Sequence, residues 1–203
     1  MSNEENSYWN GWDHVVDQII GKYDKEVTIA DLGSGKGEVG ELLHEAGYYN
    51  VDAYDIDMDQ LEERKLSYRQ TYWTNITKNG LYGKYDILAA SGFFGYRETR
   101  YKQYSSDAIK DADWKTNPSG WDKLMSNLYE AVKDDGVMIM TVPIGKYWVE
   151  TKFINSPWWE DITPEGIEDF MGRKESWKNW QGEDINLDFY FATKILRKKK
   201  HVK

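Results

Sequence analysis

One stretch of the sequence, residues 27–57, constrains the fold more than any other. A short run rich in β-branched residues leads to Asp31 and is followed by a turn with three glycines, Gly33, Gly35 and Gly37. Apolar residues then recur at helical spacing over 38–46, and a second strand-like run ends at Asp55. Nucleotide-binding α/β units share this order of strand, glycine turn, helix and strand, and their final acid accepts hydrogen bonds from ribose hydroxyls. The stretch therefore predicts a site for a nucleoside-containing ligand.

The glycine spacing argues against two common phosphate-binding motifs. The dinucleotide motif Gly-x-Gly-x-x-Gly would need its third glycine at position 38, where this chain has Glu38. A Walker loop would need glycine at position 30 and serine or threonine at position 37, where this chain has Ala30 and Gly37. What remains is the pattern Asp-x-Gly-x-Gly-x-Gly, with an acid closing the second strand.

This pattern resembles motifs I and II of the class I S-adenosylmethionine-dependent methyltransferases. Glycines let the backbone come close to the amino-acid end of that cofactor, and carboxylates suit its sulfonium and ammonium groups. The resemblance implies S-adenosyl-L-methionine as the cofactor. It also implies the cofactor-binding residues, which match the family's motifs or follow neighbouring strands: Asp31, Gly33, Ser34, Gly35, Gly37, Asp55, Ile56, Asp57, Asn75, Ile76 and Ser91.

Strands and helices continue to alternate as far as residue 196. We expect helices over 8–21, 38–46 and 59–69, from Ser119 and from Thr163, and strands over 27–31, 51–55, 71–74, 85–90, 137–142, 175–181 and 187–196. A turn separates the last two strands, which predicts an antiparallel pair. With the resemblance, this order predicts an α/β fold: a Rossmann-like, doubly wound, mostly parallel seven-stranded sheet with a C-terminal antiparallel strand pair.

Residues 1–203 are expected to form a single domain of the class I methyltransferase type. Its ends are predicted to be a polar tail at 1–7 and a solvated basic tail at 197–203. The polar segment 96–118 is long for a loop inside a compact domain, and such loops are usually functional. We interpret it as an insert or lid on the substrate side.

Composition excludes several classes of function. The formal net charge of −9 and the sequence pI near 4.9 argue against a nucleic-acid-binding surface, which needs a basic face. The chain has no cysteine, so disulfides and thiolate chemistry are excluded. No apolar run approaches the roughly 18 residues of a membrane span, and the N-terminus is polar. We therefore expect a soluble, cytoplasmic protein without membrane contact. The sequence leaves the oligomeric state open.

Candidate catalytic and substrate-binding residues follow from the chemistry of methyl transfer. An activated methyl group needs mainly a nucleophile placed in line with it, and a hydroxyl or nitrogen acceptor also needs a base. The candidate bases are Tyr96, Glu98 and His14. Arg97 can hold an anionic group, and aromatic side chains suit sugar faces and planar rings. The predicted substrate contacts are Phe93, Arg97, Trp114 and Trp148.

Two differences from known branches of this family limit the reactions that we expect. The Asn/Asp-Pro-Pro-Tyr/Phe signature of base amino methylases is replaced by the segment 91–94, Ser-Gly-Phe-Phe. The strand ending at Pro143 is followed by Ile-Gly-Lys rather than by acidic metal ligands, so we predict no metal site. We expect a metal-independent methyltransferase for a small-molecule or glycan acceptor, with O-methylation favoured. Alternatives are a lyase or NAD-dependent enzyme on the same fold, and a non-catalytic cofactor-binding partner subunit.

Overall fold

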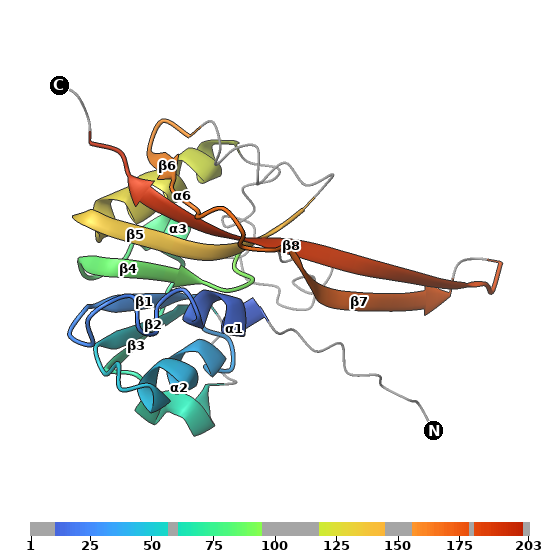
Figure 1. Cartoon of the computed structure of the whole chain (residues 1–203), viewed down its shortest axis with the longest axis horizontal. Coiled ribbons are helices and arrows are strands. Elements are labelled where there is room, and N and C mark those ends of the chain that lie inside the picture. The colour runs from blue at the N-terminus through green and yellow to red at the C-terminus, as the bar shows by residue number, and fades with distance from the viewer. Residues whose placement is uncertain (1–10, 57–60, 95–117, 145–155, 179–180, 201–203) are drawn as a thin grey trace.

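The computed structural model describes residues 11–56, 61–94, 118–144, 156–178 and 181–200. Its described residues contain one sheet of eight strands in the order β3-β2-β1-β4-β5-β8-β6, with β7 paired to β8 (Figure 1). The strands are β1 (Ile29–Leu32), β2 (Val51–Asp55), β3 (Gln70–Trp73), β4 (Tyr85–Ala90), β5 (Val132–Pro143), β6 (Trp159–Asp161), β7 (Phe170–Lys178) and β8 (Asp184–Lys198). Strands β1 to β5 pair in parallel, whereas β8 is antiparallel to β5, β6 and β7.

Helices cover both faces of the parallel part of the sheet. They are α1 (Gly11–Val16), α2 (Glu38–Glu45), α3 (Ile76–Asn79) and α6 (Pro118–Ala131), with a 3-10 helix, η1 (Glu62–Ser67), before β3. Successive strand residues point to opposite faces, so Ile29 packs with α1 and α2 while the next residue, Ala30, packs on the side of α3 and α6. Because both faces are buried, the central strands are apolar almost throughout.

The strand order reverses next to β1. The chain runs outward from β1 through β2 to β3 and then returns to the other side of β1 as β4. In open α/β sheets ligands bind beyond the carboxyl ends of the strands at such a reversal. The fold therefore directs attention to the segments that follow β1, β2 and β4.

A buried carboxylate on β2 bonds to the residue before β3 and to the first residue of β4. Asp52 on β2 is 1% exposed, and its two oxygens accept hydrogen bonds from Nε and Nη2 of Arg69 at 2.9 and 2.6 Å. The Tyr85 hydroxyl on β4 donates to the same carboxylate at 2.8 Å. A buried charge is tolerated when it is paired and hydrogen-bonded in this way.

The predicted α/β sheet is confirmed, with its mostly parallel order and its C-terminal antiparallel pair, β7 and β8. Figure 1 shows this pair as a long ribbon that extends beyond the rest of the sheet. The predicted number of strands was too low by one, because β6 adds to β8 with Trp159 opposite Lys198 and Asp161 opposite Leu196. A strand of three residues is too short to show the alternation that identifies longer strands.

The helix predicted to begin at Thr163 is wrong. The Thr163 backbone N–H and hydroxyl both donate to Oδ1 of Asp161, at 2.9 and 2.5 Å, which forms a turn. The same hydroxyl accepts a hydrogen bond from the backbone N–H of Ile195 on β8 at 2.9 Å. The side chain that would cap a helix is therefore committed to β8, and the segment stays irregular.

Three other helical predictions need correction. In the described residues the expected helix 8–21 is regular only over Gly11–Val16 and continues as turns to Gly21, whose φ is 74°. In the described part of 59–69, residues 61–69, only a 3-10 helix forms, because that segment lacks a continuous apolar stripe. Ser119 lies inside α6 rather than before it. Among the described residues, no helix combines the length and the apolar character needed to cross a bilayer.

Candidate functional site

The turn after β1 has a conformation that requires its glycines. Gly33, Gly35 and Gly37 have φ values of 68°, 52° and 90°, in the left-handed region that other residues rarely adopt. Backbone N–H groups of Gly33 and Ser34 donate to the Tyr54 carbonyl at 2.7 and 3.2 Å, which ties the turn to β2. Among the described residues, a Cβ added at Gly35 would meet only the Gly33 carbonyl oxygen, at 3.9 Å. The described part of the chain therefore leaves space above Gly35 in which a ligand could lie.

Asp55 at the end of β2 lies against this turn. Its Oδ2 accepts a hydrogen bond from the Gly35 backbone N–H at 2.8 Å, which joins the two segments that the sequence singles out. Ile56 follows and is half-buried. Asp57 lies outside the described residues.

Asp31 lies beneath the turn rather than at its surface. Its side chain is buried, and Oδ2 accepts a hydrogen bond from the Tyr68 hydroxyl at 2.6 Å. Burial raises the pKa of Asp31 to about 7; the Tyr68 hydrogen bond opposes this shift, and the negative charges of Asp55 and Glu38 add to it. Tyr68 has no sequence signal as a site residue, because it reaches Asp31 only in the folded chain.

Ser34 presents a buried hydroxyl without a partner. Its side chain is 6% exposed, and its Oγ has no hydrogen bond to any described residue. A buried polar atom left unsatisfied costs about 1–3 kcal/mol, so such atoms are uncommon away from ligand sites and ordered water. The orphaned hydroxyl fits a turn that receives a polar group from a ligand.

The segments after β3 and β4 complete this edge of the sheet. Oδ1 of Asn75 accepts a hydrogen bond from the Lys78 backbone N–H at 3.1 Å and so caps α3, while Ile76 packs into the core. Ser91 is half-buried. Phe93 contacts the glycine turn, since a Cβ at Gly33 would lie 3.0 Å from Cδ2 of the Phe93 ring. The post-β4 segment therefore lies against the predicted cofactor turn.

Trp73 at the end of β3 is a feature that sequence reasoning missed. Its side chain is 77% exposed, and its indole N–H donates to the Ile56 carbonyl. Trp73 pairs with Asp55 in the sheet, so an exposed aromatic ring lies beside the acid that closes β2. The sequence places it only within a predicted strand, 71–74, and does not show that its ring is exposed.

The catalytic and substrate candidates are only partly described. His14 on α1 stacks on Phe170 of β7, with 3.6 Å between ring centroids and 10° between ring planes. Its role in proton transfer stays a prediction. The remaining candidates fall outside the described residues: Tyr96, Arg97, Glu98, Trp114 and Trp148. The described residues contain no group of three His, Asp or Glu side chains that could hold a metal ion.

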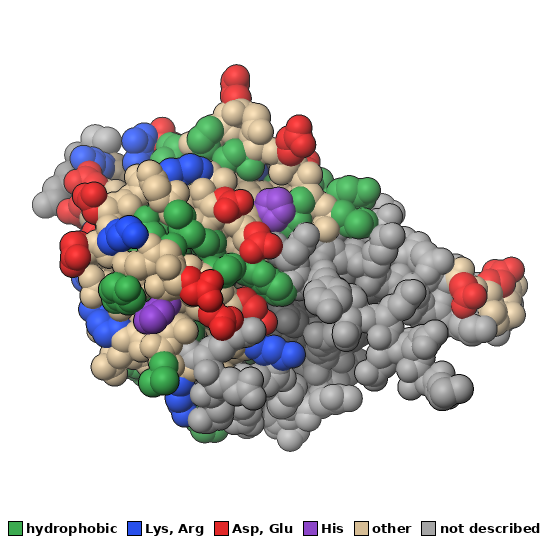
Figure 2. Space-filling view, turned by 60° about the horizontal axis from the view of Figure 1, so that its bottom comes forward, with side chains coloured by type: hydrophobic (Ala, Val, Ile, Leu, Met, Phe, Trp, Pro, Cys, Tyr) green, Lys and Arg blue, Asp and Glu red, His purple; other side chains and the backbone are tan. Residues whose placement is uncertain are grey.

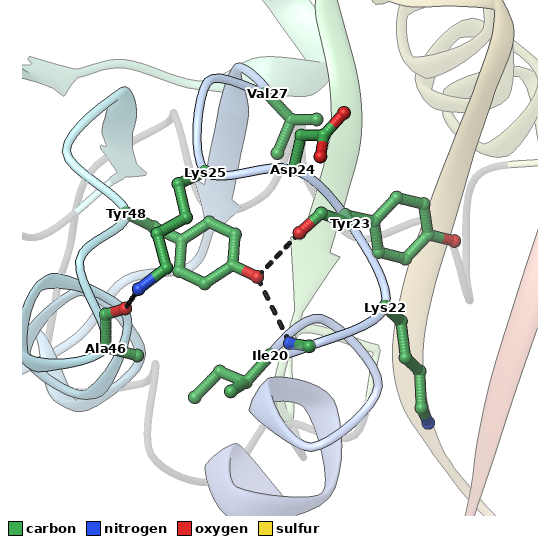
Figure 3. Close-up of a pocket in the computed structure, with 9 residues that line it drawn as sticks. Ile20, Lys22, Tyr23, Asp24, Lys25, Val27, Ala46 and Tyr48 are labelled. Atoms are coloured by element: carbon green, nitrogen blue, oxygen red, sulfur yellow. Dashed lines mark hydrogen bonds between the residues drawn. The ribbon is translucent and has the colours of Figure 1, made fainter.

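A pocket of about 660 Å³ lies near the amino end of β1, away from the carboxyl ends of the strands, and is lined mainly by the segment that precedes β1 (Figure 3). The Tyr48 hydroxyl donates to the Tyr23 carbonyl at 2.8 Å and accepts from the Gly21 backbone N–H at 3.3 Å. Nζ of Lys25 donates to the Ala46 carbonyl at 2.5 Å. These bonds join the segment before β1 to the segment that follows α2. None of the predicted site residues that the structure describes lines this pocket.

The surface carries the acidic character of the chain. Figure 2 shows Asp and Glu side chains spread over one face, with Lys and Arg side chains scattered among them on its described part. This distribution agrees with the net charge of −9.

Comparisons with known proteins give structural matches only. No protein-family model matches the sequence, and no curated protein matches it significantly. One similar solved structure is a TehB-like SAM-dependent methyltransferase from Corynebacterium glutamicum, with TM-score 0.56 and 15% identity over 93% of this chain and 88% of that one. Another is the N-methyltransferase NodS from Bradyrhizobium japonicum, with TM-score 0.54 and 11% identity over 92% of this chain and 94% of that one.

A third similar structure is the 1,6-didemethyltoxoflavin-N1-methyltransferase from Burkholderia thailandensis, which holds 1,6-didemethyltoxoflavin and S-adenosylhomocysteine. It has TM-score 0.56 and 8% identity over 93% of this chain and 79% of that one. Identities this low establish the architecture alone. With the strand order and the glycine turn described above, they show that this chain has the fold of the class I S-adenosylmethionine-dependent methyltransferases.

Proposed function

We propose that this protein is an S-adenosylmethionine-dependent methyltransferase whose cofactor lies across the carboxyl ends of β1 and β2. The observation that carries the proposal is the contact between the two motifs. The Gly35 N–H bonds to Asp55, open space lies above Gly35, and Ser34 holds an unpartnered buried hydroxyl, among the described residues. Together they offer a bare backbone, a hydroxyl and a carboxylate to one elongated polar ligand.

Each residue then has a definite part in holding the cofactor. A carboxylate has about four lone-pair positions, so Asp55 can keep its bond from Gly35 and still accept from ribose hydroxyls. Ile56 and the exposed Trp73 ring offer apolar and aromatic surface for a base next to that ribose. Asp31 supplies negative charge beneath the amino-acid end of the cofactor. Gly33, Gly37, Asp57, Asn75, Ile76 and Ser91 remain predicted cofactor contacts.

The bound cofactor would supply a methyl group already activated by its sulfonium, so the chain mainly has to place an acceptor and remove its proton. Phe93, Arg97, Trp114 and Trp148 are proposed to hold the acceptor, and Tyr96, Glu98 or His14 to take the proton. The acceptor class stays a small molecule or glycan, with metal-independent O-methylation favoured. A cytoplasmic setting is part of the same proposal, supported by the absence of cysteine from the sequence.

Calorimetric titration with S-adenosylmethionine, S-adenosylhomocysteine and NAD tests the cofactor. We expect binding of the first two and none of NAD. Asp55→Ala should weaken cofactor binding about a hundredfold, because two hydrogen bonds to a charged acceptor are lost. The control is Glu160→Ala, which removes an ion pair to Arg197 whose two side chains are both half exposed.

Turnover separates an enzyme from a cofactor-binding subunit. Release of S-adenosylhomocysteine is measured with hydroxyl- and amine-bearing acceptors, including glycans. Cofactor binding without turnover on any acceptor would favour a non-catalytic subunit. Unchanged binding by Asp55→Ala would contradict the proposed position of the ribose.

A further inference from the structure

One tyrosine outside both motifs holds the candidate site together. Tyr68 lies between η1 and β3 and is 8% exposed. Its hydroxyl donates to Oδ2 of Asp31 at 2.6 Å and accepts from the Gly40 backbone N–H at 3.2 Å. Its ring fills the space over Gly40, where an added Cβ would lie 2.2 Å from Cζ of the ring. Tyr68 therefore joins β1, α2 and the segment that leads into β3.

Both bonds satisfy groups that the local backbone leaves unpaired. The Gly40 N–H lies in the first turn of α2, where backbone donors have no partner within the helix. Asp31 is a buried carboxylate, and such a group is costly unless it is hydrogen-bonded. A phenol hydroxyl can donate and accept at once, so one side chain meets both needs. Phenylalanine could fill the same space but could make neither bond.

We propose that Tyr68 is a positioning residue for the cofactor, holding the Asp31 carboxylate and the first turn of α2 in the arrangement that receives the ammonium of the amino-acid end. This inference rests on the proposed function. Asp31 is separated from the glycine turn by one residue only, so a shift of its carboxylate would change the site where the cofactor is proposed to bind. Tyr68, which holds that carboxylate, would therefore affect affinity for the cofactor as well as packing.

The effect of Tyr68 can be measured through the pH dependence of cofactor affinity, because that affinity depends on whether Asp31 is ionised. The groups that act on Asp31 are Asp55 from β2, Glu38 from α2 and the Tyr68 hydroxyl; the two carboxylates favour the protonated form and the hydroxyl favours the ionised form. A cationic ligand binds better to the ionised carboxylate. Affinity for S-adenosylmethionine should therefore rise with pH as Asp31 ionises, and removal of the Tyr68 hydroxyl should move that rise to higher pH.

The test compares Tyr68→Phe with Tyr48→Phe. Tyr48 is also buried and bonded through its hydroxyl to Tyr23 and Gly21, but it lines the pocket near the amino end of β1. Affinity for S-adenosylmethionine is measured by calorimetry from about pH 5 to about pH 7.5, below the range in which the α-amino group of the ligand loses its proton, with thermal unfolding in parallel. We expect Tyr68→Phe to bind about tenfold more weakly near neutral pH, with its pH profile displaced upward. Tyr48→Phe should lose stability and keep the wild-type affinity and profile.

A second variant covers the case in which Tyr68→Phe fails to fold. Asp31→Asn keeps an oxygen toward Tyr68 and removes the ionisation, so its binding should be weak and should not rise with pH below about pH 7.5, where the ammonium of the ligand keeps its charge. Wild-type affinity and profile in Tyr68→Phe, or a wild-type profile in Asp31→Asn, would overturn the inference and leave the proposed function standing. Absence of S-adenosylmethionine binding by the wild-type protein would overturn both.

Discussion

Replacing Gly40 with alanine should destabilise this protein, although the same change stabilises most helices. Inside a helix, alanine is favoured over glycine by roughly 1 kcal/mol. In α2, however, the new Cβ would lie 2.2 Å from Cζ, 2.4 Å from Cε1 and 2.6 Å from the hydroxyl oxygen of Tyr68. Carbon atoms pack best at about 3.5–4.0 Å, so the ring would have to move by more than about 1 Å.

The magnitude follows from what that movement disrupts. Forcing an extra carbon into a packed interior costs about 1–3 kcal/mol. Displacing the ring also breaks its hydrogen bond to the Asp31 carboxylate, worth about 1.5–3 kcal/mol when the acceptor is charged. After the gain in helix propensity, we expect a net loss of about 1.5–5 kcal/mol and a fall in Tm of roughly 3–20 °C.

Urea unfolding followed by circular dichroism measures this loss, with the same substitution in a Tyr68→Ala background as the control. Without the ring there is no clash, so Gly40→Ala should then stabilise the protein by about 0.5–1 kcal/mol. A reversal of sign between the two backgrounds is the expected result. Stabilisation by Gly40→Ala in the wild-type background would refute the reasoning.

Two further predictions concern the same site. Ser34→Ala should leave the free energy of unfolding unchanged or raise it by up to about 1 kcal/mol, because the Ser34 hydroxyl has no hydrogen-bond partner among the described residues, yet it should weaken S-adenosylmethionine binding. A large loss of stability would show that the hydroxyl has a partner within the chain. The second prediction concerns pH. Because burial raises the pKa of Asp31 from 3.8 to about 7, the folded state binds an extra proton in that window, and stability should fall as pH rises through it. Thermal unfolding of the wild type and Asp31→Asn should show a smaller fall in the variant, and equal slopes would contradict this account.

The parts of the fold that follow from local rules could be predicted from the sequence. The turn after β1 needs glycines because three of its residues have positive φ, and that requirement is visible in the spacing alone. The strand at 85–90 is apolar except for Asp86 and has the bounds that the structure shows. The position of Asp55 beside the turn follows once β1 and β2 are taken as parallel neighbours.

The failures at Thr163 and Trp73 share a cause, because both depend on contacts between segments that are distant in the sequence. Thr163 has a strong local signal for a helix start. Its hydroxyl, however, accepts a hydrogen bond from the backbone N–H of Ile195, 32 residues away, and so does not cap a helix. Trp73 was missed because nothing in its neighbourhood shows that its ring is exposed beside Asp55.

The sequence by itself determined the class of fold and the positions of the glycines and acids along the chain. Backbone conformation and side-chain periodicity act over a few residues, so they can be read from the order of residues alone. Only the tertiary structure decided that Asp31 is buried beneath the turn and held by Tyr68, 37 residues away. Contacts over such separations depend on how the strands and helices pack, and no local pattern encodes which distant side chain will fill a given space.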